Sequence, residues 1–494
     1  MSDAKNEDFK SGFKAAGLFG GVQVFKIVIS IVNSKIIALL LGPYGMGIQS
    51  LLNSTVSTIS QATYLGLGTS AVRDVSAAHA SGDQDKLNRT ITVFRKLVWW
   101  TGLFGLLVCA LFSPLWSKLS FGNMDWVWSF VALSVILLAV QLSSGQTVIL
   151  QGTKRYKDLA KANVLGSLFG LILTTPLYYF FGIKAIVPGL ILIALGNLFF
   201  SWLFSRKVKV ERMHLAIRDI FADGRVMVEM GFLVALQGFF NLLFAYLVRV
   251  YVSHTGGIED VGLYNAGFAI VNTYVGMVFT AMGTEYYPRL CTHCENREAF
   301  DNAVNQQMIL SLLLIAPLVA LFLVFGKLGI IVLYSEKFVT ATMMVSLGML
   351  GVLFKAPTWC MGFTFLAKSD TKAFFWNELL SALVFFFLNI AFYHWWGLNG
   401  LGWSFLVGYF YCMLQSCIIC HMRFGYKIDS TILRIITPQL VMCILILACV
   451  LSNAAWLKYG AGSVLLLLIC FFSYKELNKR LPVKDFLLAK LGKH

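Results

Sequence analysis

The chain has 494 residues, of which 58% are hydrophobic and only 13% are charged, and its mean hydropathy is +0.75. A soluble domain of this length could not bury that much apolar surface, so a soluble enzyme is excluded. The formal net charge is +16. The basic residues lie at the ends of apolar runs, which indicates membrane topology rather than a nucleic-acid partner.

Apolar runs of about 20 residues, the length that crosses a bilayer, follow one another along the chain. We predict fourteen transmembrane helices, over residues 14–41, 45–72, 97–117, 127–150, 162–182, 186–205, 226–252, 264–287, 305–326, 338–367, 374–395, 401–422, 433–452 and 459–474. The predicted fold class is therefore an all-α polytopic membrane protein.

The distribution of Lys and Arg predicts the orientation. Thirty of the forty basic residues fall on the side that holds the N-terminus, and five fall within spans. The five on the opposite side are Lys118, Lys184, Lys327, Lys337 and Lys458. By the positive-inside rule both termini are cytosolic. The loops are too short to hold a folded catalytic domain.

An internal repeat predicts the domain organisation. The basic, amphipathic segment 206–225 separates an N-lobe (1–205, six helices) from a C-lobe (226–422, six helices), and 423–494 adds two helices and a basic tail. Chemically similar residues recur at an offset of 214 or 215: Gln23/Gln237, Lys35/Arg249, Gly47/Gly262, Gly68/Gly283, Lys154/Lys368, Asn163/Asn377 and Gly182/Gly397. Because six is even, the repeat is parallel, and such transporters bind substrate between the halves.

Basic side chains inside the spans are the candidate functional residues, since a charge there costs at least about 2.5 kcal/mol. Lys26 lies near the predicted midplane of the first helix, and Lys355 is central in the tenth, two residues before Pro357. A cavity role and a structural partnership with a neighbouring helix both remain open for Lys26. Lys35 and Arg249 lie nearer the outer helix ends, where snorkelling to the interface is the alternative.

No carboxylate is predicted near the midplane, so the deep field is positive. We expect Lys26, Lys35, Arg249 and Lys355 to bind an anionic group, of which a diphosphate suits several basic donors best. The polar residues expected to line the same cavity are Gln23, Asn33, Gln237 and Asn241. We expect no catalytic residues, no metal and no cofactor.

Three segments resemble the Wzx-type O-antigen flippases, which belong to a superfamily with the MATE exporters and the lipid II flippase. They are LLGPYGMGI (40–48), GLGTSAVRD (66–74) and LQGTKRYKDLAKANVLGSLFGLILTTPLYYFFGIKAIVPG (150–189). The resemblance implies a V-shaped pair of six-helix lobes in the bacterial inner membrane. It also implies that alternating access moves undecaprenyl-diphosphate-linked oligosaccharide, a precursor of lipopolysaccharide or another surface polysaccharide, from the cytosolic to the periplasmic leaflet.

The same resemblance implies roles and partners. Arg73, in the AVRD motif, would admit the substrate at the cytosolic side. The partners would be the lipid-linked glycan and membrane lipids, with polysaccharide polymerase or ligase machinery as a further candidate. The family commonly has twelve helices, so the last two are a departure and resemble the extra pair of the lipid II flippase. An inside-negative potential would favour export of the anion by about 2.3 kcal/mol per charge per 100 mV.

Other functions remain open. A MATE-like drug exporter would share the fold but would disfavour basic residues in its cavity. A lipid II flippase would suit the same positive cavity and the same number of helices. A membrane glycosyltransferase or polymerase is a remote alternative, suggested by Asp83-Gln-Asp85, which resembles a metal-binding motif but has no nucleotide-binding fold around it.

Overall fold

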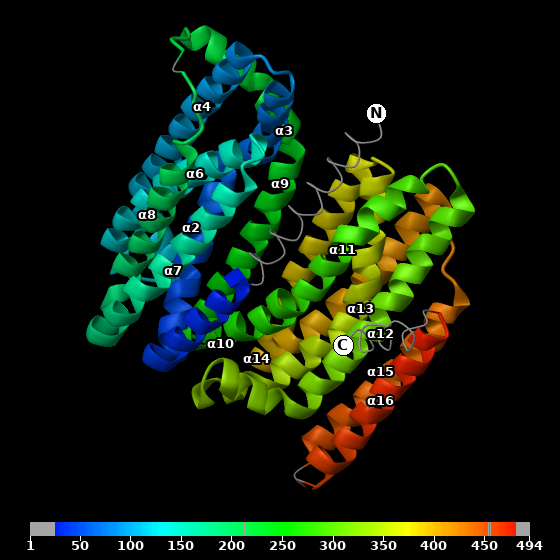
Figure 1. Cartoon of the computed structure of the whole chain (residues 1–494). Coiled ribbons are helices and arrows are strands. Elements are labelled where there is room, and N and C mark those ends of the chain that lie inside the picture. The colour runs from blue at the N-terminus through cyan, green and yellow to red at the C-terminus, as the bar shows by residue number, and fades with distance from the viewer. Residues whose placement is uncertain (1–24, 212, 453, 455, 481–494) are drawn as a thin grey trace, which may run out of the picture. The chain divides into compact units, whose positions relative to one another are not determined.

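Backbone polar groups inside a bilayer must be satisfied within the segment that crosses it, and helices do this. The computed structural model describes residues 25–480 except 212, 453 and 455, and every regular element within these ranges is helical (Figure 1). In this part of the chain, ten helices are long and apolar enough to cross a membrane, and Tyr156–Ser205 and Thr371–Phe424 each contain two predicted spans. The prediction of an all-α polytopic membrane protein is confirmed.

Contacts divide the chain into two compact units, Met1–Gly262 and Leu263–His494. The first unit contains a helix over residues 25–40, α2 (Gly42–Tyr64), α3 (Leu67–Ala80), α4 (Gln84–Leu111), α5 (Ser113–Phe121), α6 (Val127–Gly152), α7 (Tyr156–Phe181), α8 (Ile186–Ser205) and α9 (Ile217–Thr255). Within this unit, α6 packs against both α4 and α8, and α9 packs on α2, α3, α4 and α5. The contacts thus join α9 to the first compact unit, and the linker predicted over residues 206–225 ends within this helix.

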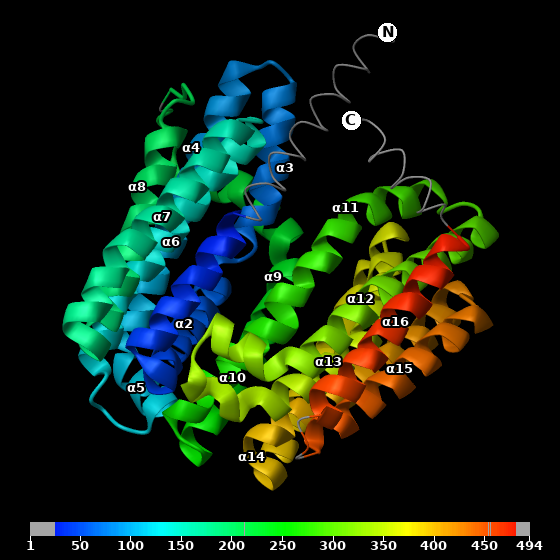
Figure 2. The same cartoon turned by 60° about the horizontal axis from the view of Figure 1, so that its bottom comes forward.

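Helix α10 (Ile258–Phe268) begins in the last residues of the first unit, and the second unit starts within it at Leu263. It continues with the π-helical turn η2 (Ala269–Tyr274), α11 (Val275–Thr292), α12 (Arg297–Leu333), α13 (Thr342–Ala367), α14 (Thr371–Phe424), α15 (Ser430–Leu451) and α16 (Gly462–Asn478). The last two helices lie side by side and both pack on α12, as Figure 2 shows. They are therefore part of the second compact unit rather than a separate domain.

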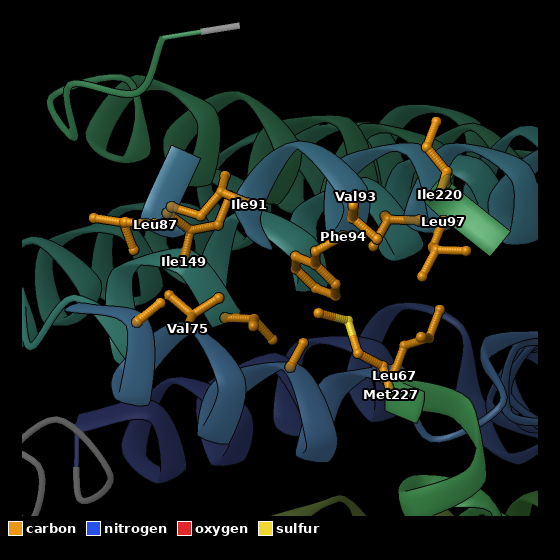
Figure 3. Close-up of a cluster of buried hydrophobic side chains, with 14 residues drawn as sticks. Leu67, Val75, Leu87, Ile91, Val93, Phe94, Leu97, Ile149, Ile220 and Met227 are labelled. Carbon is orange, nitrogen blue, oxygen red and sulfur yellow. The ribbon is translucent and has the colours of Figure 1, made fainter. Parts of the chain in front are cut away.

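A buried apolar cluster holds α3, α4, α6 and the start of α9 together in the first unit. Figure 3 shows Val75 of α3, Phe94 of α4, Ile149 of α6 and Ile220 of α9 pointing into one core, and Val75, Phe94 and Ile149 are fully buried. The segment predicted as a linker, 206–225, contributes to this core. Its second part forms the first turns of α9, and apolar side chains from its irregular first part pack on the cluster.

The internal repeat is visible in the backbone. Left-handed φ values recur at an offset of 215 residues in three pairs: Gly42/Gly257, Lys154/Ser369 and Gly182/Gly397. The turns after α6 and α13 also share a hydrogen bond, Arg155 N–H to Leu150 O at 2.9 Å and Asp370 N–H to Phe365 O at 3.0 Å. The backbone therefore aligns Lys154 with Ser369, one residue away from the Lys154/Lys368 match predicted from side-chain chemistry.

One repeat-related pair of glycines lies at a close helix contact within the first unit. A Cβ atom on Gly47 of α2 would lie 2.0 Å from the carbonyl oxygen of Ile258, and one on Gly262 of α10 would lie 1.9 Å from that of Pro43. Pro43 and Ile258 are themselves separated by the repeat offset. The starts of α2 and α10 thus pack on each other reciprocally, and only a residue without a side chain fits at either position.

Two helix boundaries differ from the predictions for different reasons. The predicted helix 45–72 is broken at Leu65 and Gly66, which have φ values of 51° and 73°. The predicted helix 97–117 begins at Gln84, because the Asp83 carboxylate accepts hydrogen bonds from the backbone N–H groups of Asp85 and Lys86, both at 3.0 Å. Asp83 is therefore the N-cap of α4, and this structural role accounts for an aspartate at this position of the Asp83-Gln-Asp85 motif.

We expect Asp83→Ala to destabilise the protein by about 1 kcal/mol and Asp83→Asn to have little effect, because an asparagine side chain caps a helix as well as aspartate does. Thermal unfolding of the purified variants measures both. An equal loss for the two variants would contradict the capping role and reopen the metal-binding interpretation.

Candidate functional site

Lys355 lies in a polar cluster of the second unit that three elements build. Its Nζ atom, on α13, donates a hydrogen bond of 2.7 Å to Oδ1 of Asn272, on the π-helical turn η2. The Tyr409 hydroxyl, on α14, donates to the same oxygen at 2.7 Å. The Lys355 ammonium also lies 5.2 Å from the centroid of the Tyr409 ring, a cation–π geometry.

The local backbone explains how the asparagine reaches the lysine. A π-helical turn departs from the α-helical hydrogen-bond ladder, and such turns are frequent at functional sites. On the facing helix, Pro357 has no N–H to donate to the carbonyl of Leu353, so α13 lacks one ladder bond beside Lys355. Both elements thus depart from a regular ladder at the level of the cluster.

The cluster has more donors than acceptors. Among the described residues no carboxylate forms an ion pair with Lys355, and both of its contacts are with neutral side chains. An ammonium group has three donors. The Nδ2 group of Asn272 is buried and has no hydrogen-bond partner in the described part of the chain. The site therefore offers N–H groups and a positive charge to an anionic oxygen.

Arg249 lies in a different environment, in the first unit. Its residue is only 9% exposed; Nε donates to Ser50 Oγ at 3.0 Å, and a terminal nitrogen donates to the Ala245 carbonyl at 2.8 Å. The side chain therefore bridges α9 and α2 in this conformation. Both roles that the sequence left open for Arg249, cavity lining and snorkelling, stay predictions.

The other predicted residues also belong to the first unit. Lys26, Asn33 and Lys35 are half-buried on the helix over residues 25–40, whereas Gln23 lies outside the described residues. On α9, Gln237 is half-buried and Asn241 is exposed. Arg73 of α3 is exposed and pairs with Asp74 at 3.0 Å. The structure thus divides the predicted basic residues between the units, with Lys355 alone of the four in the second.

The sequence analysis singled out Lys355 as a candidate but did not predict its contacts with Asn272 and Tyr409. Along the chain, Asn272 lies 83 positions from Lys355 and 137 positions from Tyr409, and it is hydrogen-bonded to both. An asparagine inside an apolar segment was the available signal, because a buried amide in a membrane needs partners. That this asparagine is hydrogen-bonded to Lys355 follows from tertiary packing, which the sequence alone does not give.

The fold is that of known transporters. It superposes on the lipid II flippase MurJ in an inward closed conformation with a TM-score of 0.72 and 12% identity, covering 93% of this chain and 99% of that one. It superposes on an inward-facing multidrug resistance MATE family transporter of the MOP superfamily with a TM-score of 0.69 and 13% identity, covering 83% and 96%. It superposes on a MOP superfamily transporter from Pyrococcus furiosus with a TM-score of 0.60 and 14% identity, covering 83% of this chain and 96% of that one.

At these identities the structural matches show the fold and nothing finer. No curated protein sequence matches the chain significantly. A family described as polysaccharide biosynthesis protein matches residues 14–293, more than half of the chain. The chain therefore belongs to the polysaccharide biosynthesis protein family and is a multi-pass membrane protein with the fold shared by MurJ and the MATE transporters.

Proposed function

We propose that this protein is a flippase of the Wzx type, which moves undecaprenyl-diphosphate-linked oligosaccharide from the cytosolic to the periplasmic leaflet by alternating access. The observation that carries the proposal is the donor-rich cluster around Lys355. Among the described residues its ammonium has no carboxylate as counter-ion, and the buried Asn272 Nδ2 has no hydrogen-bond partner. Membership of a polysaccharide biosynthesis family and a transporter fold support it independently. The diphosphate would supply the missing negative charge.

The charge of this site distinguishes the proposal from its nearest alternative. A MATE-like exporter of cationic drugs would have to place a positive ligand beside Lys355, which costs Coulomb energy in a site of low dielectric constant. A lipid II flippase also carries a diphosphate, so the cluster suits it equally, and only the sugar moiety separates the two. The proposal contains no bond-making step and needs no cofactor or metal, so the protein would be a transporter rather than an enzyme.

Each predicted basic residue has a distinct role in this proposal. Lys355 of the second unit binds the diphosphate, and Lys26 and Lys35 of the first unit are also proposed to bind it. Arg249, whose guanidinium donates to Ser50 and Ala245 in the described conformation, is proposed to join them. Arg73 admits the substrate at the cytosolic side. The residues proposed as the polar lining for the sugars are Asn33, Gln237, Asn241 and Gln23.

The remaining features of the proposal concern location and energy. The protein would lie in the bacterial inner membrane with both termini in the cytosol, and would pass its product to polysaccharide polymerase or ligase machinery. The substrate is anionic, so the inside-negative potential would drive export at about 2.3 kcal/mol per charge per 100 mV. No carboxylate relay is then required.

A binding experiment with an isosteric variant tests the proposed substrate class. We expect polyprenyl diphosphate to bind the purified wild type and a cationic drug not to bind. We expect Asn272→Asp to weaken diphosphate binding roughly ten- to hundredfold, since the new carboxylate neutralises Lys355 and removes a charge-assisted contact of about 1.5 to 3 kcal/mol. Calorimetry or microscale thermophoresis in detergent measures these affinities, with Asn302→Asp, at an exposed position of α12 in the same unit, as the matched control.

Tight binding of the cationic drug, strengthened by Asn272→Asp, would overturn the anion proposal and favour the MATE-like alternative. Equal diphosphate affinities for the wild type and Asn272→Asp would separate this site from the substrate.

A further inference from the structure

The first unit contains an apolar pocket that plays no part in the function proposed above. Its volume is about 630 Å³, and it lies among the C-terminal end of α2, the start of α3, α4 and the first turns of α9. Ala62, Leu97, Phe104 and Phe221 are among the side chains that line it. A pocket of this volume falls in the range that accommodates small ligands.

Close helix contacts frame the pocket. Next to α2, a Cβ atom on Gly105 of α4 would lie 3.0 Å from the Thr63 hydroxyl oxygen, and next to α4, one on Gly224 of α9 would lie 2.8 Å from Leu97. Between these contacts, the break at Leu65 and Gly66 interrupts the α2–α3 rod. The helices are therefore held close beside an open space rather than collapsed into it.

The interior of the pocket is chemically apolar even where hydroxyl groups line it. Thr63 donates its hydroxyl to the Ile59 carbonyl at 3.0 Å, and Thr101 donates to the Val98 carbonyl at 3.2 Å, so both are satisfied by their own helices. On another wall, the rings of Trp100 and Phe221 stack with centroids 5.2 Å apart. Such an interior suits a hydrocarbon chain and offers it no polar contact.

The rim of the pocket carries one charge of each sign. Arg225 and Glu229 of α9 line it and form an ion pair of 2.6 Å between Nε and Oε1, with side chains that are 80% and 58% exposed. The predicted orientation places this end of α9 at the cytosolic membrane surface, and tryptophan, here Trp100, is typical of that interface. An apolar interior below a neutral pair of opposite charges matches an amphiphile whose headgroup also holds both charges.

We propose that this pocket binds one acyl chain of a zwitterionic membrane phospholipid of the phosphoethanolamine class. Arg225 pairs with the phosphate, Glu229 pairs with the primary ammonium, and the chain lies against Phe104 and Phe221. The ion pair gives the rim no net charge, so an anionic lipid or a polyprenyl diphosphate would gain an attraction from Arg225 and suffer a repulsion from Glu229. The inference does not depend on the proposed flippase activity.

Native mass spectrometry of the purified full-length protein tests the proposal, with dioleoyl phosphatidylethanolamine, phosphatidylglycerol and phosphatidylcholine as lipid probes and polyprenyl diphosphate as a further ligand. We expect phosphatidylethanolamine to bind roughly two- to fivefold more tightly than phosphatidylglycerol, as an exposed ion pair allows. Phosphatidylcholine should be the weaker of the two zwitterions, because its quaternary ammonium has no N–H to donate to Glu229. Arg218→Gln, a change of the same kind on α9 outside the pocket lining, should leave the preference unchanged.

Two variants separate the headgroup from the chain. Glu229→Gln should abolish the preference for phosphatidylethanolamine over phosphatidylglycerol. Ala62→Phe should fill the pocket and reduce retention of all three lipids. A preference for phosphatidylglycerol in the wild type, or lipid retention unchanged by Ala62→Phe, would overturn the proposal and leave the pocket an unselective lipid-facing groove. Polyprenyl diphosphate bound more tightly than phosphatidylethanolamine and displaced by Ala62→Phe would instead assign the pocket to the transported substrate.

Discussion

Replacement of Lys355 by methionine is expected to lower the rate of lipid-linked glycan translocation roughly ten- to hundredfold, because it removes one charge-assisted contact to the diphosphate. Methionine has a similar length and no charge. The Tyr409 hydroxyl still donates to Asn272 Oδ1 when Lys355 is absent, so the acceptor keeps a partner. Removing a buried charge that forms no ion pair among the described residues should leave the protein at least as stable as the wild type.

The matched control for this prediction is Lys337→Met, which removes an exposed lysine of the same unit. It should translocate substrate at the wild-type rate. Reconstitution of each variant in liposomes, together with its thermal unfolding midpoint, measures rate and stability separately. A wild-type rate for Lys355→Met would exclude this lysine from substrate handling, and a large fall in its unfolding midpoint would assign it a structural role.

Alanine at either glycine of the α2–α10 contact is expected to destabilise the first unit by about 3 kcal/mol, near the upper end of the usual cost of overpacking. The added Cβ atom would lie 2.0 Å from the Ile258 carbonyl oxygen in Gly47→Ala and 1.9 Å from that of Pro43 in Gly262→Ala. Both distances are far below van der Waals contact, and the obstructing atoms belong to the backbone, so the helices themselves must move apart.

The control is Gly326→Ala, inside α12, where a Cβ atom would meet no heavy atom within 4 Å. Because alanine favours a helix over glycine by up to about 1 kcal/mol, this variant should be neutral or slightly stabilised. Thermal unfolding in one detergent compares the three variants. Unfolding midpoints for Gly47→Ala and Gly262→Ala that equal that of Gly326→Ala would contradict the close reciprocal packing.

Apolar length predicted some helices closely and others poorly, for a physical reason. The predicted spans 127–150 and 186–205 correspond to Val127–Gly152 and Ile186–Ser205. By contrast, the span predicted from residue 97 begins at Gln84. Hydropathy reports where a helix enters the hydrocarbon, whereas a cap such as Asp83 sets where the helix starts, and the two differ when polar turns continue into water.

The candidate site was predictable only in part. A charge inside an apolar segment identifies Lys355 from sequence alone, because its cost demands an explanation. The π-helical turn that carries Asn272, and the approach of Tyr409 from α14, follow from packing between segments far apart in the chain. Arg249 shows the same limit: the repeat identified its equivalence with Lys35, but its hydrogen bond to Ser50 depends on how α9 meets α2.

The most direct test of the proposed function is the movement of a fluorescent polyprenyl-diphosphate oligosaccharide between the leaflets of liposomes that contain the wild-type protein. We predict translocation that requires the protein, accelerates when the imposed potential favours movement of the anion, and falls in Lys26→Ala. Absence of glycan movement, with uptake of a cationic drug by the same liposomes, would contradict the account and support a MATE-like exporter.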